Sequence, residues 1–189
     1  MGRPQKPGLR EPNGRRDRKL LEMEKLLDLE AEQREAVSVA LEARIRVFGV
    51  DTRTARDQMM GSFIGRLCIM GQKGGAGISQ AQYNAAQSYL RDRNAWQRAI
   101  GAKPDYEEAR PESQGLGDYE DFCRRAKARW ADIRSEITDL MVEVNDPAIA
   151  DSLDKLVVRD LEYWPYVGAL RLVLNRLDKF YSAEGRRAA

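Results

Sequence analysis

Apolar residues recur every three or four positions along most of this 189-residue chain, and the alternation typical of β-strands is missing. Such spacing places apolar side chains on one face of an α-helix. Helices are predicted over residues 17–48, as one long helix or two in tandem, and over 51–71, 79–100, 118–144, 147–162 and 165–181. The pattern therefore predicts an all-α protein with a helical hairpin or bundle at each end.

Capping signals support several of these boundaries. Ser79 and Gln82 have the spacing of a capping box, in which each residue satisfies a backbone N–H of the other. Asp146-Pro147 and Trp164-Pro165 place proline in the first turn of a new helix. The last helix is expected to end before Gly185, because glycine commonly follows the end of a helix.

The 51–71 segment is predicted to form one continuous central helix, because it is apolar around much of its circumference. Gly61 and Gly65 lie four residues apart, a spacing that opens a smooth strip where another backbone can approach closely. Residues 118–144 carry an apolar seam typical of a helix that packs lengthwise against others, as in a coiled coil.

Charge divides the chain into regions. Residues 1–19 contain seven Lys or Arg and two acids, whereas residues 20–185 contain 23 basic and 28 acidic residues. The basic arm is broken by proline and glycine and is too polar to fold alone, so it is expected to be mobile until a partner orders it. We expect four regions: the arm at 1–19, a helical region at 20–100, a linker or exposed loop at 101–117, and a second helical region at 118–185 for oligomerisation or partner binding.

A polyanion is the natural partner of such an arm, because basic side chains that neutralise phosphates release condensed counterions. Double-stranded DNA is therefore the first hypothesis. A basic terminus can also keep a protein soluble or pair with an acidic protein. The predicted phosphate contacts of the arm are Arg3, Lys6, Arg10, Arg15, Arg16, Arg18 and Lys19.

The third predicted helix carries a polar face that contains no acid, with residues spaced four, three, four, three and four apart. Amides can pair with adenine edges and Arg with guanine edges in the major groove. The order of 52–70, a turn and 79–100 resembles a helix-turn-helix, although the turn is long. Ordinary solvated surface and a contact between subunits are the alternatives. The face consists of Gln80, Asn84, Gln87, Arg91, Asn94 and Arg98. The predicted DNA contacts are Gln80, Asn84, Gln87, Arg91 and Arg98 on this face, and Lys73 in the preceding loop.

The residue types argue against an enzyme. Histidine is absent, which removes the commonest base for nucleophile activation and the commonest metal ligand. The loop sequence KGGAG at 73–77 lacks the final Lys-Ser/Thr of a phosphate-binding loop. We expect no catalytic site, metal or cofactor. The two cysteines favour a reducing compartment such as the cytoplasm, and no apolar run is long enough to cross a membrane.

The opening GRPQKP, followed by Leu9-Arg10 and Asn13-Gly14-Arg15, resembles the start of bacteriophage small terminase subunits. The resemblance covers about the first tenth of the chain. It implies a mostly helical, non-catalytic protein that binds viral DNA, forms a ring and hands DNA to a large ATPase–nuclease subunit in the host cytoplasm. It also implies DNA contacts by the arm and the 52–100 helix pair, and subunit contacts by 118–144.

Two other classes of protein fit the same sequence. A structural virion protein, such as a head-to-tail adaptor or scaffold, would use its helices for protein contacts and its arm to hold a neighbouring subunit. A transcriptional regulator would use the same helix pair in a dimer on a palindromic site.

Overall fold

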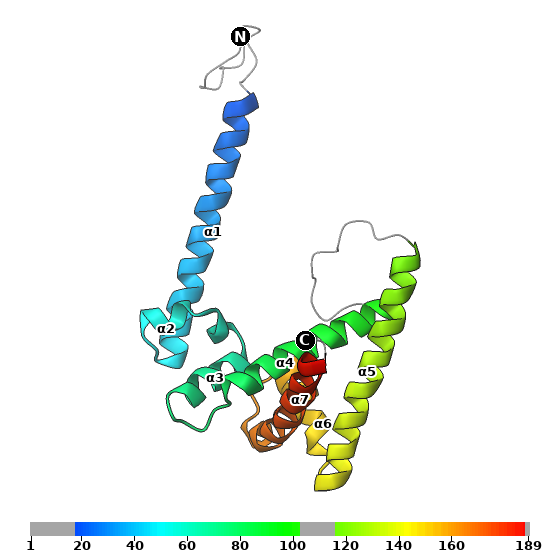
Figure 1. Ribbon diagram of the computed structural model, residues 1–189. Coiled ribbons are helices and arrows are strands. Elements are labelled where there is room, and N and C mark those ends of the chain that lie inside the picture. The colour runs from blue at the N-terminus through cyan, green and yellow to red at the C-terminus, as the bar shows by residue number, and fades with distance from the viewer. Residues whose placement is uncertain (1–17, 103–115, 188–189) are drawn as a thin grey trace, which may run out of the picture. The chain divides into compact units, whose positions relative to one another are not determined.

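The computed structural model describes residues 18–102 and 116–187, which are almost entirely helical and contain no β-strand (Figure 1). The all-α prediction is therefore confirmed. The elements in chain order are α1 (Arg18–Phe48), α2 (Thr52–Arg56), the 3₁₀ helix η1 (Gln58–Gly61), α3 (Phe63–Gln72), α4 (Gln80–Ala99), α5 (Leu116–Val144), α6 (Ala148–Ser152), the π-helix η2 (Leu153–Val158), the 3₁₀ helix η3 (Trp164–Tyr166) and α7 (Val167–Arg187).

The chain divides into two compact units, one ending at Asp57 and the other beginning at Gln58. The first unit contains α1 and α2. Helix α1 ends as predicted at Gly49, which has a φ of 60° and donates its N–H to the Ile45 carbonyl at 2.9 Å. Ala55 of α2 is completely buried, and its carbonyl accepts a hydrogen bond from Arg44 Nη1 at 3.1 Å. This bond fixes α2 against the C-terminal half of α1.

The predicted continuous helix over 51–71 is wrong, because the chain forms α2, η1 and α3 instead. Asp57 adopts an extended conformation with ψ of 129°, and so does Ser62, with ψ of 155°. Ser62 then caps α3 by accepting a hydrogen bond from the Gly65 N–H at 3.1 Å. A serine that can bond to the backbone three residues on favours a helix start over a helix interior.

Gly65 is approached closely by backbone, but the predicted strip of Gly61 and Gly65 on one helix is not formed, because Gly61 belongs to η1 and Gly65 to α3. A Cβ built on Gly65 would lie 1.9 Å from the Met59 carbonyl oxygen. The approaching backbone comes from η1, immediately before α3 in the chain, so this glycine serves the local turn.

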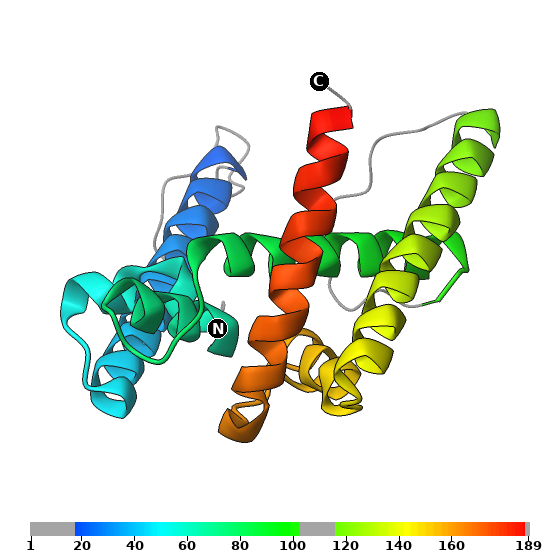
Figure 2. The ribbon, with the colours of Figure 1, turned by 60° about the horizontal axis from the view of Figure 1, so that its bottom comes forward.

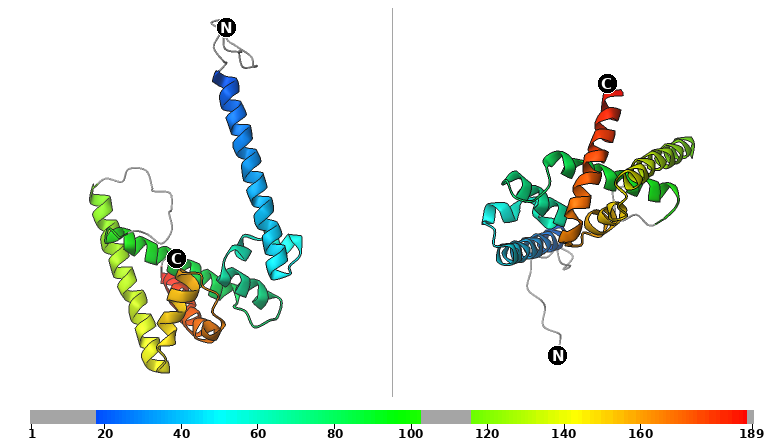
Figure 3. Two further views of the ribbon diagram at one scale, coloured as in Figure 1. Left: turned by 180° about the vertical axis from the view of Figure 1, so that it is seen from behind. Right: turned by 90° about the horizontal axis from the view of Figure 1, so that it is seen from below.

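The second unit is built around α4, and α5 and α7 pack against it; both helices cross α4 steeply in Figure 2, and Figure 3 shows the same neighbours from two other directions. The capping box of α4 is confirmed: Ser79 Oγ accepts from the Gln82 N–H at 3.2 Å, and Gln82 Oε1 accepts from the Ser79 N–H at 2.7 Å. The largest fully buried side chains of this core are Phe63, Ile64, Leu67, Ile78, Ile133, Ile149, Leu153, Leu156, Leu170, Val173, Leu174 and Leu177.

Helix α5 follows the predicted apolar seam, and the central part of that seam is buried within the chain's own second unit. Trp130 lies between Tyr89 and Trp96 of α4, with ring centroids 5.4 Å from each. Ile133, 0% exposed, continues the same buried line. The seam that was predicted for subunit contacts thus forms intramolecular core. Of the predicted linker, residues 103–115 lie outside the described residues.

The two C-terminal helices differ from their predictions. The segment predicted as helix over 147–162 forms α6 and then η2, and Arg159 to Tyr163 are not helical. Asp146 bonds to the first turn of α6, as predicted, since its Oδ1 accepts a hydrogen bond from the Ala148 N–H at 2.9 Å. Helix α7 does not end before Gly185 but continues to Arg187.

Candidate nucleic-acid interface

Helices α3 and α4 form a tight pair whose connection is fixed by backbone contacts. The Ile78 N–H donates to the Leu67 carbonyl of α3 at 3.0 Å. A Cβ on Gly77 would lie 1.9 Å from that same carbonyl oxygen, and a Cβ on Gly71 would lie 2.1 Å from the Ile78 carbonyl oxygen. The glycines of this loop therefore permit close packing of the two helices.

The loop and the first half of α4 present the polar side chains that the sequence predicted. Lys73 is exposed at the C-terminus of α3, and Gln80, Asn84 and Arg91 are exposed on α4. We call these four residues the α3–α4 surface. Gln80 Nε2 donates to Asn84 Oδ1 at 3.0 Å, and Arg91 Nη2 donates to Ser88 Oγ at 2.9 Å.

Gln72, which the sequence analysis did not single out, extends this row of amides. Its Nε2 donates to Gln80 Oε1 at 3.0 Å. The prediction ended the helix at Gly71 and so placed Gln72 in the loop. Each amide group has two N–H donors and an oxygen that can accept two hydrogen bonds, so the bonds within this row leave some of its donors and acceptors available. Such amide donors and acceptors are the groups that contact base edges.

The second half of the predicted face is not open surface. Asn94 is 1% exposed, and Gln87 and Arg98 are half-buried. Helix α5 packs on this part of α4, where Arg129 Nε lies 2.7 Å from Asp92 Oδ1. The prediction that the whole face is exposed is therefore wrong at Gln87, Asn94 and Arg98. Periodicity alone does not show that other helices pack against part of this face.

Charge on the α3–α4 segment is strongly asymmetric. From Gln58 to Ala102 the sequence has five basic residues and a single acid, Asp92. Asp92 is paired with Arg129 of α5, and Arg66 of α3 is paired with Glu162 at 2.8 Å. Lys73 and Arg91 carry the exposed positive charge of the α3–α4 surface. Their field favours an anionic ligand.

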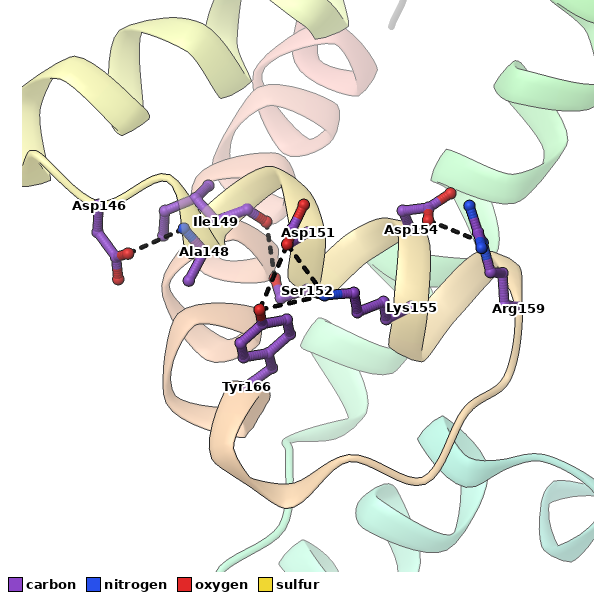
Figure 4. A network of polar contacts seen from close by, with 9 residues as sticks. All are labelled: Asp146, Ala148, Ile149, Asp151, Ser152, Asp154, Lys155, Arg159 and Tyr166. Atoms are coloured by element: carbon purple, nitrogen blue, oxygen red, sulfur yellow. Dashed lines mark hydrogen bonds and ion pairs between the residues drawn. The ribbon is translucent and has the colours of Figure 1, made fainter.

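The segment from Asp146 to Glu162 holds many acids, and Figure 4 shows three of them, Asp146, Asp151 and Asp154, in contact with residues of the same segment. Lys155 Nζ lies 3.0 Å from Asp151 Oδ2 and 3.2 Å from the Tyr166 hydroxyl. The hydrogen bond from Lys155 lowers the pKa of the exposed Asp151 carboxyl. The bonds to Tyr166 and then Asp151 raise the pKa of Lys155. This network ties η3 to η2.

Asp160 and Glu162 are attached to the start of α3. Asp160 Oδ1 accepts a hydrogen bond from the Phe63 N–H at 2.6 Å, with Asp160 at a φ of 52°. Trp164 contacts the Phe63 ring edge to face, with centroids 5.4 Å apart. No local sequence signal could reveal this cap, because its donor and acceptor lie 97 residues apart.

A buried polar cluster joins α4, α5 and α7. Burial, followed by the nearby Asp92 carboxylate, raises the pKa of the Tyr181 hydroxyl far above its ordinary value. Arg129 lies over the Tyr181 ring, with Cζ 5.5 Å from the centroid. Nearer the start of α4, Gln82 Nε2 donates to Asn175 Oδ1 of α7 at 2.9 Å.

The predicted arm residues Arg3, Lys6, Arg10, Arg15 and Arg16 lie outside the described residues. Arg18 and Lys19 are the first two residues of α1. Over 18–102 and 116–187, no group of three or more Cys, Asp or Glu side chains is arranged to hold a metal ion. Within those same ranges, no helix has the length and apolar character needed to cross a bilayer.

No family model matches this sequence, and comparisons with curated proteins and with solved structures found no match either.

Proposed function

We propose that this chain is a non-catalytic DNA-binding protein that recognises viral DNA for packaging, in the manner of a small terminase subunit. The observation that carries the DNA-binding proposal is the α3–α4 surface, where Lys73 and Arg91 flank the amides of Gln80 and Asn84. Basic side chains would position the duplex through phosphates, and the amides would contact base edges.

The basic arm supports the same proposal by a separate mechanism. Its five basic residues before α1 would bind phosphates without a folded pocket, through counterion release. The assignment to packaging rests on the resemblance of the opening residues to small terminase subunits. On that reading the protein assembles as a ring, and its partner is a large ATPase–nuclease subunit. Several arms held in one ring would raise the effective concentration of each for the same duplex.

The test measures duplex binding as a function of salt concentration. Each phosphate contact contributes about 0.9 to the slope of log affinity against log salt. Changing both Lys73→Gln and Arg91→Gln should lower the slope by up to about 1.8, and deleting residues 1–17 should lower it by up to about 4.5. Arg134→Gln, an exposed Arg of α5, is the matched control and should leave the slope unchanged.

Two results would contradict the proposal. One is the absence of duplex binding by the full chain even at roughly 50 mM salt, where electrostatic binding is strong. The other is an equal loss of slope in Arg134→Gln, which would mean that affinity follows net charge and not the α3–α4 surface. A native mass corresponding to a ring of many copies would support the packaging role, and a dimer bound to a palindromic site would favour a regulator.

A further inference from the structure

Three amide side chains on α3 and α4 form a connected row that is attached to the core. Gln72 Nε2 donates to Gln80 Oε1 at 3.0 Å, and Gln80 Nε2 donates to Asn84 Oδ1 at 3.0 Å. We call Gln72, Gln80 and Asn84 the amide row. The thiol of Cys68, which is completely buried, donates to the same Gln80 oxygen at 3.5 Å and accepts from Gln72 Nε2 at 3.7 Å. One end of the row is therefore held by a core residue of α3.

Gln80, in the middle of the row, has little hydrogen-bonding capacity left for a base. A side-chain amide oxygen can accept two hydrogen bonds, and the nitrogen can donate two. The Gln80 oxygen already accepts from Gln72 and Cys68, and its nitrogen donates to Asn84. A single N–H remains, which is too little for a two-point contact. Turning every amide of the row around gives the same result, because the middle amide then still uses both its nitrogen and its oxygen within the row.

Asn84 ends the row and keeps both kinds of group. Its oxygen accepts one bond, from Gln80, and the row uses neither of its N–H groups. Asn84 is exposed, and it lies one turn after Gln80, the first residue of α4. The N-terminal residues of a recognition helix are those that contact base edges. Asn84 is thus the member of the row with both the position and the groups for a two-point contact.

Adenine is the base whose major-groove edge matches such an amide. It presents an N7 acceptor beside an N6 donor, whereas guanine presents two acceptors, N7 and O6. Asn84 Nδ2 can donate to adenine N7 while its Oδ1 accepts from N6. Guanine would place O6 against the Asn84 oxygen, and two acceptors repel each other.

We propose that Asn84 reads an adenine in the major groove through two hydrogen bonds, and that Gln80 is the residue that positions it. This inference rests on the duplex binding proposed above, and it adds the base that is read and the different roles of the two amides. Gln72 and Cys68 act one step further away, because they hold the Gln80 amide.

The experiment begins with the selection of tightly bound duplexes from a random pool by the full chain. We expect the enriched duplexes to share an A·T pair. Fluorescence anisotropy then gives the dissociation constant of one enriched duplex and of two altered forms. Exchanging the shared pair for G·C should weaken binding about tenfold or more. Replacing its adenine by 7-deazaadenine, which lacks the N7 acceptor, should weaken binding about fivefold. We call the ratio of the G·C to the A·T dissociation constant the base discrimination.

Asn84→Ala removes the proposed contact with adenine. The base discrimination should fall to within about twofold of equal binding, because no other member of the row can make the two-point contact. The slope of log affinity against log salt should not change, since Asn84 carries no charge. Alanine is a good helix former at this exposed position, and circular dichroism checks the fold. Gln33→Ala, which removes an exposed amide of α1, is the matched control and should change neither quantity.

Gln80→Leu tests the positioning role. Leucine cannot hold the Asn84 amide, so the base discrimination should fall to an intermediate value while 7-deazaadenine still weakens binding. Combined with Asn84→Ala, Gln80→Leu should reduce the base discrimination no further, because a positioning residue acts only through the residue that it positions. A residue that contacted the base itself would lower it in both backgrounds.

Several results would overturn the inference. One is complete loss of base discrimination in Gln80→Leu with only partial loss in Asn84→Ala, which would assign the base contact to Gln80. Another is unchanged affinity for the 7-deazaadenine duplex, which would exclude the N7 contact. Enriched duplexes that share no A·T pair would overturn this inference while salt-dependent binding left the proposed function in place. A full chain that binds no duplex would overturn both.

Discussion

The connection between α3 and α4 should not tolerate a methyl group at Gly77. A Cβ at this position would lie 1.9 Å from the Leu67 carbonyl oxygen and 2.3 Å from the Gly71 nitrogen. Both neighbours are backbone atoms and cannot rotate away as a side chain can. Gly77→Ala must therefore displace the loop from α3.

The magnitude follows from the hydrogen bonds that the displacement would break. One is the bond from the Ile78 N–H to the Leu67 carbonyl at 3.0 Å, and the other runs from Arg171 Nε to the Gly77 carbonyl at 2.9 Å. Loss of a neutral and a charged bond costs about 3 kcal/mol together. Reduced freedom of the unfolded chain offsets somewhat less than 1 kcal/mol of this. The net loss of about 2 to 3 kcal/mol should lower the melting temperature by roughly 10 °C.

Urea unfolding followed by circular dichroism measures this loss. Gly168→Ala is the control, because a Cβ at this exposed α7 position has no atom within 4 Å and alanine is the better helix former. We expect Gly168→Ala to be as stable as the unchanged protein or more so. If Gly77→Ala unfolds within about 0.5 kcal/mol of the unchanged protein and with the same denaturant slope, the close approach does not hold in solution.

Two further predictions concern Asp151 in α6 and Asp160 in the connection to α7. Asp160→Ala should cost about 1 to 2 kcal/mol in urea unfolding, because it removes the acceptor of the Phe63 N–H, whereas Asp160→Asn keeps an acceptor and tolerates the positive φ. An unchanged unfolding free energy in Asp160→Ala would show that the cap does not contribute, and equal losses in both variants would show that an uncharged acceptor does not replace the carboxylate. Asp151→Asn should destabilise the protein near neutral pH, and the difference should disappear as the pH falls below the ordinary value of 3.8. The reason is that a carboxyl with a lowered pKa in the folded state stabilises that state only while ionised. A difference that persists in acid would contradict this assignment.

Helix positions could be predicted from the sequence where their signals are local. The capping box of α4 and the glycine stop of α1 each involve residues within four positions of one another, so the pattern contains all the information needed. The break before α3 was not predicted, because the prediction of one helix rested on the apolar character of residues 51–71 and Ser62 interrupts it locally. Its cap is completed by Asp160, which only the tertiary fold brings to Phe63.

The candidate site could be predicted only in part, because tertiary packing decides which side chains of a helix stay exposed. Periodicity identifies the face of α4 that carries Gln80 and Arg91, but it does not say which other helix covers that face. Asn94 is buried because α5 lies along the second half of α4, and Gln82 is buried because Asn175 on α7 satisfies its amide. Polar residues on a helix face are exposed only where no partner with matching hydrogen bonds packs against them.

The structure separates the shape of the proposed interface from its charge, and this separation makes the proposal testable. Shape depends on Gly77 and on the Asp160 cap, whereas exposed charge depends on Lys73 and Arg91. Arg66 does not add exposed positive charge to this surface, because it is paired with Glu162. Substitution of Lys73 and Arg91 should therefore weaken duplex binding with little change in unfolding free energy, since exposed charges contribute little to stability. The main effect of Gly77→Ala should be a lower unfolding free energy. Its effect on binding should depend on how far it moves Lys73 away from Gln80.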